Sequence, residues 1–116
     1  MSVLIEDSRG LAAAIASDEA LVLFYASWCP FSRSFLPVFE KHASGPGCYR
    51  VLTDQLPAAE TAHEIDFVPT VIHFRNGRKY ARLDGIPGEG LREHMLLDFM
   101  QSFRNGRAPG VDKPAE

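Results

Sequence analysis

The chain has 116 residues, 46% of them hydrophobic and 23% charged, with a formal net charge of −3 at pH 7. This size and composition predict one globular domain with a single core. Acidic and basic residues are interspersed, which argues against a nucleic-acid partner. The sequence has neither a run of about 18 apolar residues, as a membrane helix needs, nor a secretory signal. We therefore expect a cytoplasmic protein without a membrane partner, and a leader removed from a longer chain stays an open alternative.

Strand and helix signals alternate through the first half of the chain. The predicted elements are a short strand at Val3–Ile5, a helix at Ser8–Ser17, a strand at Ala20–Ala26, a helix from Pro30 to about residue 43, a strand at Tyr49–Thr53 and a helix at Pro57–Glu64. The run Ala20–Ala26 is apolar throughout, which is typical of a central strand buried on both faces. The alternation predicts parallel pairing with right-handed crossovers.

The second half predicts an antiparallel pair and a last helix. Val71–Phe74 and Lys79–Leu83 are strand-like and flank Asn76-Gly77, a strong hairpin signal. A helix is expected after Gly90. Its apolar stripe consists of Leu91, Met95, Leu96, Phe99 and Phe103.

These elements predict one α/β domain, with a central mixed sheet of about five strands flanked by about four helices. The domain is expected to span residues 1–103. Residues 104–116 are rich in proline, glycine and charge and lack apolar periodicity, so they are predicted to form a flexible tail.

Cys29 is the predicted reactive group. It lies between a buried strand and a helix that begins at Pro30, so its sulfur is expected beside the unpaired N–H groups of the helix start. Those groups favour an anion, and the thiolate is the reactive form of cysteine. We therefore expect an exposed, nucleophilic thiol, the alternative being a small buried hydrophobe. The Ser32 hydroxyl can donate a hydrogen bond to the same sulfur but cannot form a disulfide.

The remaining cysteine, the histidines and the glycines do not indicate a second chemical site. Cys48 follows a Gly-Pro-Gly loop and begins a strand, which favours a packing role; a regulatory or resolving thiol is the alternative. The four histidines and two cysteines lack the spacing of zinc ligands, so no metal site is expected. No phosphate-binding glycine motif is present. We expect no bound cofactor.

Two segments resemble the thioredoxin superfamily. LVLFYASWCPFSRSFLPVFE is similar to its active-site strand, motif and helix, including the helix proline at Pro37. FVPTVIHFRNGRKYARLDG is similar to its segment with a cis proline, a strand, an Asn-Gly turn and a second strand. The resemblance covers roughly residues 3–103 and implies a thioredoxin fold. It also implies that Pro69 is cis and faces Cys29.

The resemblance implies a client-binding surface around the thiol. Its expected residues are Trp28, Pro30, Phe31, Val68, Pro69 and Ile86. The Val68 backbone would pair with an extended segment of the client, and Trp28, Phe31 and Ile86 would form an apolar rim. Alternatives remain, since proline before a strand is usually a turn device and these apolar side chains also suit a core.

The sequence departs from the family at two positions. Ser32 stands where the resolving cysteine is usual, and Leu23 where the central strand usually buries an acid. Two basic residues are candidates for supporting the thiolate. Arg50 matches a position that is often basic, and Arg33 follows Ser32 directly; a solvated strand charge and a helix-surface arginine are the respective alternatives.

Two functions fit these residues. Motifs of the form Cys-x-x-Ser resemble monothiol glutaredoxin-like and disulfide-isomerase-like members, which favours an enzyme. The Cys29 thiolate would form a mixed disulfide with a protein or glutathione, released by an external thiol such as glutathione or by the client's second cysteine. The alternative is a client-binding or redox-sensing module. In both cases the partners are thiol- or disulfide-bearing proteins.

Overall fold

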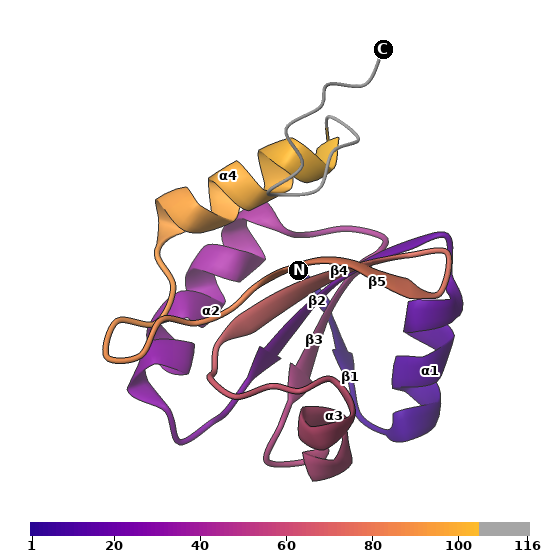
Figure 1. The fold of residues 1–116 in the computed structure, drawn as a ribbon, viewed down its shortest axis with the longest axis horizontal. Coiled ribbons are helices and arrows are strands. Elements are labelled where there is room, and N and C mark those ends of the chain that lie inside the picture. Colours follow the sequence, from indigo (N-terminus) through magenta and orange to yellow (C-terminus); the bar gives the residue numbers. More distant parts are fainter. Residues whose placement is uncertain (105–116) are drawn as a thin grey trace.

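The structure, a computed structural model, describes residues 1–104 and contains every predicted element (Figure 1). The strands are β1 (Val3–Ile5), β2 (Glu19–Tyr25), β3 (Cys48–Leu52), β4 (Thr70–Arg75) and β5 (Arg78–Leu83). The helices are α1 (Ser8–Ala16), α2 (Pro30–His42), α3 (Pro57–Ala62) and α4 (Glu93–Arg104).

The boundaries differ from the predicted ones where local geometry intervenes. Helix α3 ends at Ala62 rather than at Glu64, because Glu64 has a left-handed φ of 54° that cannot continue the helix. Helix α4 begins at Glu93 and includes Arg104, which was predicted to begin the tail. The rest of the predicted tail lies outside the described residues.

The five strands form one mixed sheet in the order β1-β3-β2-β4-β5. Strands β1, β3 and β2 are parallel, and β4 and β5 are antiparallel to their neighbours. The predicted Asn-Gly hairpin joins β4 to β5. Asn76 and Gly77 have φ angles of 53° and 80°, both positive as a type I′ turn requires. The fold class predicted from the sequence is confirmed.

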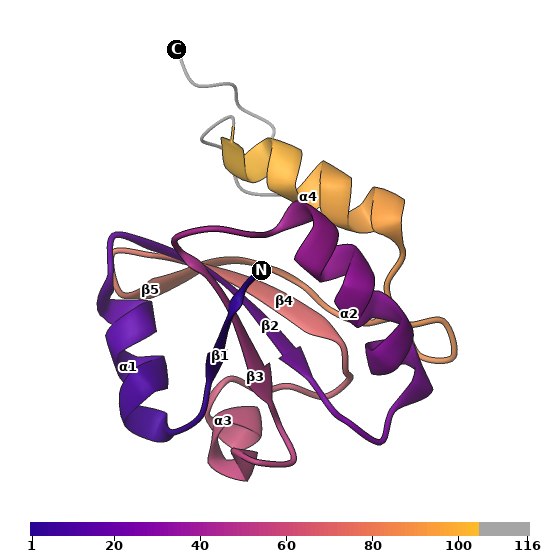
Figure 2. The ribbon, with the colours of Figure 1, turned by 180° about the vertical axis from the view of Figure 1, so that it is seen from behind.

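Helices cover both faces of the sheet (Figures 1 and 2): α1 and α3 lie on one face, α2 and α4 on the other. Side chains of β2 alternate between the two layers. Ala20, Val22 and Phe24 pack in the core under α1 and α3. The core under α2 and α4 receives Leu21, Leu23 and Tyr25. Strand β2 is therefore fixed by packing on both sides, as its apolar sequence predicted.

A half-buried ion pair ties the sheet to α2. The Arg50 guanidinium on β3 donates to a carboxylate oxygen of Glu40 on α2 at 2.9 Å, and it also donates to the backbone oxygen of Ser2. Glu40 in turn accepts from the Ser2 backbone N–H at 2.6 Å and from its hydroxyl at 2.8 Å. This network holds the start of the chain, β3 and α2 together.

Among the residues described, no helix combines the length and the apolar character that crossing a membrane requires. The cytoplasmic location expected from the sequence stays a prediction.

Removal of the Glu40 charge should destabilise the fold. In Glu40→Gln the half-buried Arg50 guanidinium loses its counterion, so we expect the free energy of unfolding to fall by about 2 kcal/mol. The matched control is Glu93→Gln, which removes an exposed carboxylate paired with Lys41 and His42 and should leave the denaturation midpoint unchanged. Equal denaturant midpoints for the two variants would contradict a stabilising role for the network.

Candidate functional site

Cys29 lies at the end of β2 and at the start of α2. It is the N-cap residue of α2, in an extended conformation, and Pro30 occupies the first helical turn. Its backbone N–H donates to the Ala26 carbonyl at 3.3 Å, and its carbonyl accepts from Arg33 N–H at 3.0 Å. The side chain makes no capping hydrogen bond. Cys29 therefore stands at the amino end of α2, where the sequence placed it.

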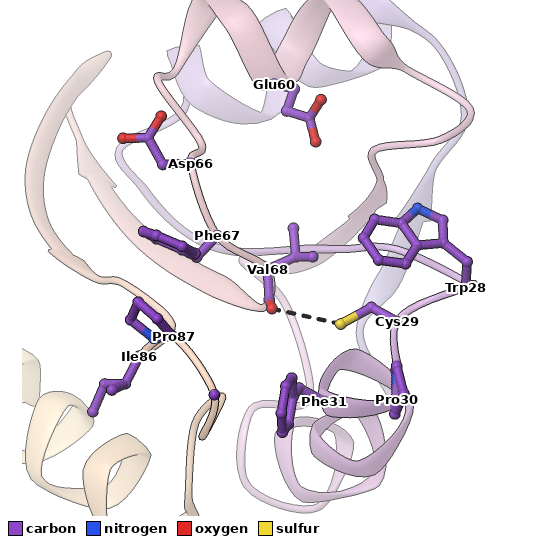
Figure 3. A pocket seen from close by; sticks show the side chains of 11 residues that line it. Trp28, Cys29, Pro30, Phe31, Glu60, Asp66, Phe67, Val68, Ile86 and Pro87 are labelled. Carbon is purple, nitrogen blue, oxygen red and sulfur yellow. Dashed lines mark hydrogen bonds between the residues drawn. The ribbon is translucent and has the colours of Figure 1, made fainter.

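The expectation of an exposed thiol is wrong for this conformation. Cys29 is only 5% exposed, although its neighbour Trp28 is 67% exposed. The reason is its orientation: the Cys29 Sγ turns inward and donates to the Val68 carbonyl oxygen at 3.8 Å (Figure 3). The sulfur still lines a surface groove, so it is covered by its hydrogen-bond partner and neighbours rather than packed in either core.

The segment opposite Cys29 contains a cis peptide bond between Val68 and Pro69. Thr70 is fully buried, and its hydroxyl donates to the Phe67 carbonyl at 2.6 Å and accepts from Gly85 N–H at 3.4 Å. A Cβ atom on Gly85 would lie 2.6 Å from the Pro69 carbonyl oxygen, so only glycine allows this approach. These contacts fix the Val68 carbonyl against the sulfur.

A groove of 370 Å³ opens beside the sulfur (Figure 3). Its lining residues are Trp28, Cys29, Pro30, Phe31, Glu60, Asp66, Phe67, Val68, Ile86, Pro87 and Gly88. The structure therefore brings together every residue that the sequence placed on the client-binding surface except Pro69. Pro69 is buried and does not line the groove. It forms the cis peptide bond with Val68, which does line the groove.

Five groove residues were not predicted from the sequence: Glu60, Asp66, Phe67, Pro87 and Gly88. Phe67 is exposed beside Val68, and the carboxylates of Glu60 and Asp66 lie on the α3 side of the groove. The signal available for Phe67 was an aromatic residue two positions before the expected cis proline. Glu60 had no such signal, because its place depends on how α3 packs against the sheet.

Ser32 does not have the role expected from the sequence. It is fully buried, and its hydroxyl oxygen accepts a hydrogen bond from the Ala26 N–H at 3.1 Å. This bond joins the first turn of α2 to the chain that leaves β2. The hydroxyl is therefore engaged with the backbone, and no hydrogen bond to the Cys29 sulfur is present among the described residues.

Polar contacts hold the turn just before Cys29. The Asp54 carboxylate accepts from the Ser27 N–H at 3.1 Å and from the Ser27 hydroxyl at 2.6 Å, and these hydrogen bonds lower the pKa of Asp54. Arg33 donates to the Ser27 carbonyl at 3.2 Å. The Arg33 side chain thus contacts the backbone of the turn. Asp54 follows β3, whose carboxyl end lies beside that of β2.

Arg50 does not support the thiolate through direct contact. It pairs with Leu23 in the sheet register, inside β2 rather than at its end. Its guanidinium is engaged by Glu40 and Ser2. The structure therefore gives Arg50 a structural ion pair instead of the electrostatic role considered from the sequence.

Cys48 lies at the wrong end of the sheet to resolve a disulfide on Cys29. In the parallel register Cys48 is opposite Leu21, near the start of β2, and Leu52 is opposite Tyr25, the last residue of β2. Cys29 follows the end of β2 that lies beside Leu52. Leu52 lies four residues after Cys48, a distance of about 13 Å at roughly 3.3 Å per residue along a strand. A disulfide needs Cα atoms within about 7 Å. Burial and the nearby Glu40 carboxylate raise the pKa of the Cys48 thiol.

The raised pKa predicts slow alkylation of Cys48. In Cys29→Ser, iodoacetamide should label Cys48 more slowly in the folded protein than in the denatured chain at the same pH, and the rate should rise towards alkaline pH. Because the pKa of Cys48 is higher in the folded protein than in the unfolded chain, the unfolded chain loses the thiol proton first as pH rises. The free energy of unfolding should therefore fall as pH rises from the unfolded-state pKa towards the folded-state pKa. Equal labelling of folded and denatured protein near neutral pH would contradict this assignment.

The arrangement of the sheet, the Cys29 turn and the cis proline is that of a thioredoxin fold. The thioredoxin of Plasmodium falciparum superposes with a TM-score of 0.78 at 17% identity, covering 87% of this chain and 98% of that one. The thioredoxin of Malassezia sympodialis gives a TM-score of 0.76 at 22% identity, covering 88% and 90%. At this level of identity the likeness concerns the fold.

The sequence profile of the family described as Thioredoxin matches residues 3–101, and the chain belongs to this family. The thioredoxin of Alicyclobacillus acidocaldarius is 32% identical over 93 residues, which cover 76% of this chain and 89% of that protein. The chloroplastic thioredoxin M-type of Pisum sativum is 35% identical over 78 residues, covering 63% of this chain. The match spans only 45% of the length of the plant protein. Family membership supports a thiol–disulfide redox function in general.

Proposed function

We propose that this protein carries out thiol–disulfide exchange through one nucleophilic cysteine, Cys29. The observation that carries the proposal is the position of the sulfur, at the amino end of α2 and at the wall of an apolar groove. The groove offers aromatic and aliphatic side chains to a client, and the Val68 backbone lies beside the sulfur. Extended client segments would pair with that backbone.

The reaction proceeds by exchange between sulfur atoms. Cys29 Sγ breaks its hydrogen bond with Val68, releases its proton to solvent and attacks one sulfur of the client disulfide. A new disulfide forms between Cys29 and the client, and the client's other sulfur leaves as a thiolate that takes up a proton. An external thiol such as glutathione, or the client's own freed thiol, then releases Cys29. No net oxidation or reduction of the client occurs when its own thiol completes the cycle.

The chain lacks a thiol for an intramolecular second step. Ser32 stands at the position of the resolving cysteine, and the register keeps Cys48 at the far end of β3. Leu23 is fully buried where an acidic residue would otherwise accept the proton of a second thiol. The two replacements are consistent with each other, because a proton acceptor for a resolving thiol has no use when that thiol is absent.

A binding module is the second candidate, and the low exposure of Cys29 favours it. In this case the groove retains extended clients, and the thiol senses oxidation or holds a client covalently without turnover. The two functions differ in exchange kinetics but share the groove. Trp28, the only tryptophan of the chain, provides a fluorescence signal for binding that is independent of exchange.

Mass spectrometry of the protein after incubation with a disulfide peptide tests the proposal. We expect one mixed disulfide per chain, located on Cys29, and its release when glutathione is added. Cys48→Ser should retain this adduct and Cys29→Ser should lose it. An adduct on Cys48, or an unmodified protein whose Trp28 fluorescence still responds to the peptide, would reject exchange through Cys29; the second result would favour the binding module.

Restoration of a second thiol should create a dithiol enzyme. In Ser32→Cys, the new thiol lies in the first turn of α2 and should form a disulfide with Cys29. Catalysed reduction of a disulfide peptide by dithiothreitol should rise by roughly tenfold or more, because the resolving step becomes intramolecular. Ser34→Cys is the matched control, since its exposed side chain lies about 200° further round the helix and should give no such gain. Equal rates for the two variants would show that the site cannot support thiol exchange of this kind.

A further inference from the structure

The groove beside Cys29 has charge of one sign only. Of its eleven lining residues, Glu60 and Asp66 are acidic and none is basic. The remaining lining is apolar apart from the thiol and Gly88. Figure 3 shows Glu60 reaching down from α3 towards the groove between Trp28 and Val68, with Asp66 beyond Phe67. A client entering the groove therefore meets an apolar wall on one side and carboxylates on the other.

Among residues 1–104, these two carboxylates have no side-chain partner. Within the part of the chain that the structure describes, neither side chain makes an ion pair or a hydrogen bond. Some other surface carboxylates do have such partners: Asp54 binds Ser27, Asp84 binds Arg82 and Glu93 binds His42. Glu60 and Asp66 are thus free to interact with a cation on a client.

The negative side of the groove continues beyond it. Asp66 also lines two adjoining hollows, one shared with Glu60 and Glu64 and the other with Glu64 and Asp84. Arg82, a cation on that side, is engaged by Asp84 and by the backbone of the loop after α3. The potential at this rim is therefore negative, and it lies next to the groove that contains the nucleophile.

We infer that the groove selects protein disulfides with lysine or arginine beside the reacting cysteine, and that Glu60 and Asp66 determine this preference. The inference rests on the proposed exchange through Cys29. Clefts lined by one sign of charge raise association rates with oppositely charged partners and lower them with like-charged ones. Glutathione carries two carboxylates and one amine, so it is a poorer match to this rim than a basic peptide is.

The preference concerns the first covalent step. The Cys29 thiolate attacks the cysteine sulfur of a client, a Cys29–client disulfide forms, and the displaced sulfur leaves as a thiolate. A cationic side chain next to the client cysteine would lie near Glu60 or Asp66 during this attack, while the client's apolar side chains contact Trp28 and Phe67. The carboxylates act by attracting and orienting the client and take no part in the bond changes.

The test compares two peptides that differ only in charge. Each carries one cysteine as a mixed disulfide with 2-thiopyridine, whose release reports attack, and the cysteine is flanked by lysine in one peptide and by glutamate in the other. With Cys48→Ser protein at low ionic strength, we expect the lysine peptide to react roughly tenfold faster than the glutamate peptide. Added salt should reduce this ratio.

Charge variants identify the residues responsible. Glu60→Gln with Asp66→Asn should bring the two rates to within about twofold, and Glu60→Lys with Asp66→Lys should favour the glutamate peptide. The matched control is Asp18→Asn with Asp98→Asn, which changes the net charge equally at two exposed positions outside the groove and should preserve the preference. Equal rates in the parent protein, with Cys29 reacting, would overturn the charge inference alone. No reaction of Cys29 with either peptide would overturn the proposed function and this inference with it.

Discussion

The position of the Cys29 sulfur depends on the burial of β2. This strand lies at the centre of the sheet, pairs with β3 on one side and β4 on the other, and packs against helices on both faces. Its carboxyl end therefore cannot shift without disturbing both cores. Cys29 lies shortly after this end, at the start of α2. The Ser32 hydroxyl on α2 accepts a hydrogen bond from the Ala26 N–H and so links the helix to the segment that leaves β2. The thiol and the start of α2 are consequently held in a fixed relation to the sheet.

The same constraint brings Cys29 together with the cis Val68–Pro69 segment. Strand β4 pairs with β2 in an antiparallel register, with Thr70 opposite Phe24, so the residues before β4 lie beside the turn after β2. Thr70 and Gly85 then fix the Val68 carbonyl in front of the sulfur. The site is thus built from two chain segments whose relative position is set by the core, and the other side chains that line the groove surround them.

Much of this structure could be predicted from the sequence, because the relevant signals are local. The apolar run of β2, the Asn76-Gly77 turn and Pro30 at the start of α2 each have one favoured conformation, and all are found as expected. The inward orientation of Cys29 and the hydrogen bond between Ser32 and Ala26 could not be predicted. The Cys29 thiol and the Ser32 hydroxyl each had other hydrogen-bond partners available, and only the folded backbone decides that they bind the Val68 carbonyl and the Ala26 N–H. The ion pair of Arg50 depends on α2 packing over β3, and Glu60 reaches the groove only through the placement of α3.

The lifetime of the Cys29 mixed disulfide tests the central claim most directly. The protein would be loaded with a peptide that carries a single cysteine, freed of excess reagent and kept folded without added thiol, and the adduct followed by mass spectrometry. Because neither Ser32 nor Cys48 can displace the peptide, the account predicts that the adduct persists and that added glutathione releases it. Spontaneous loss of the peptide, with appearance of a disulfide between Cys29 and Cys48, would contradict it.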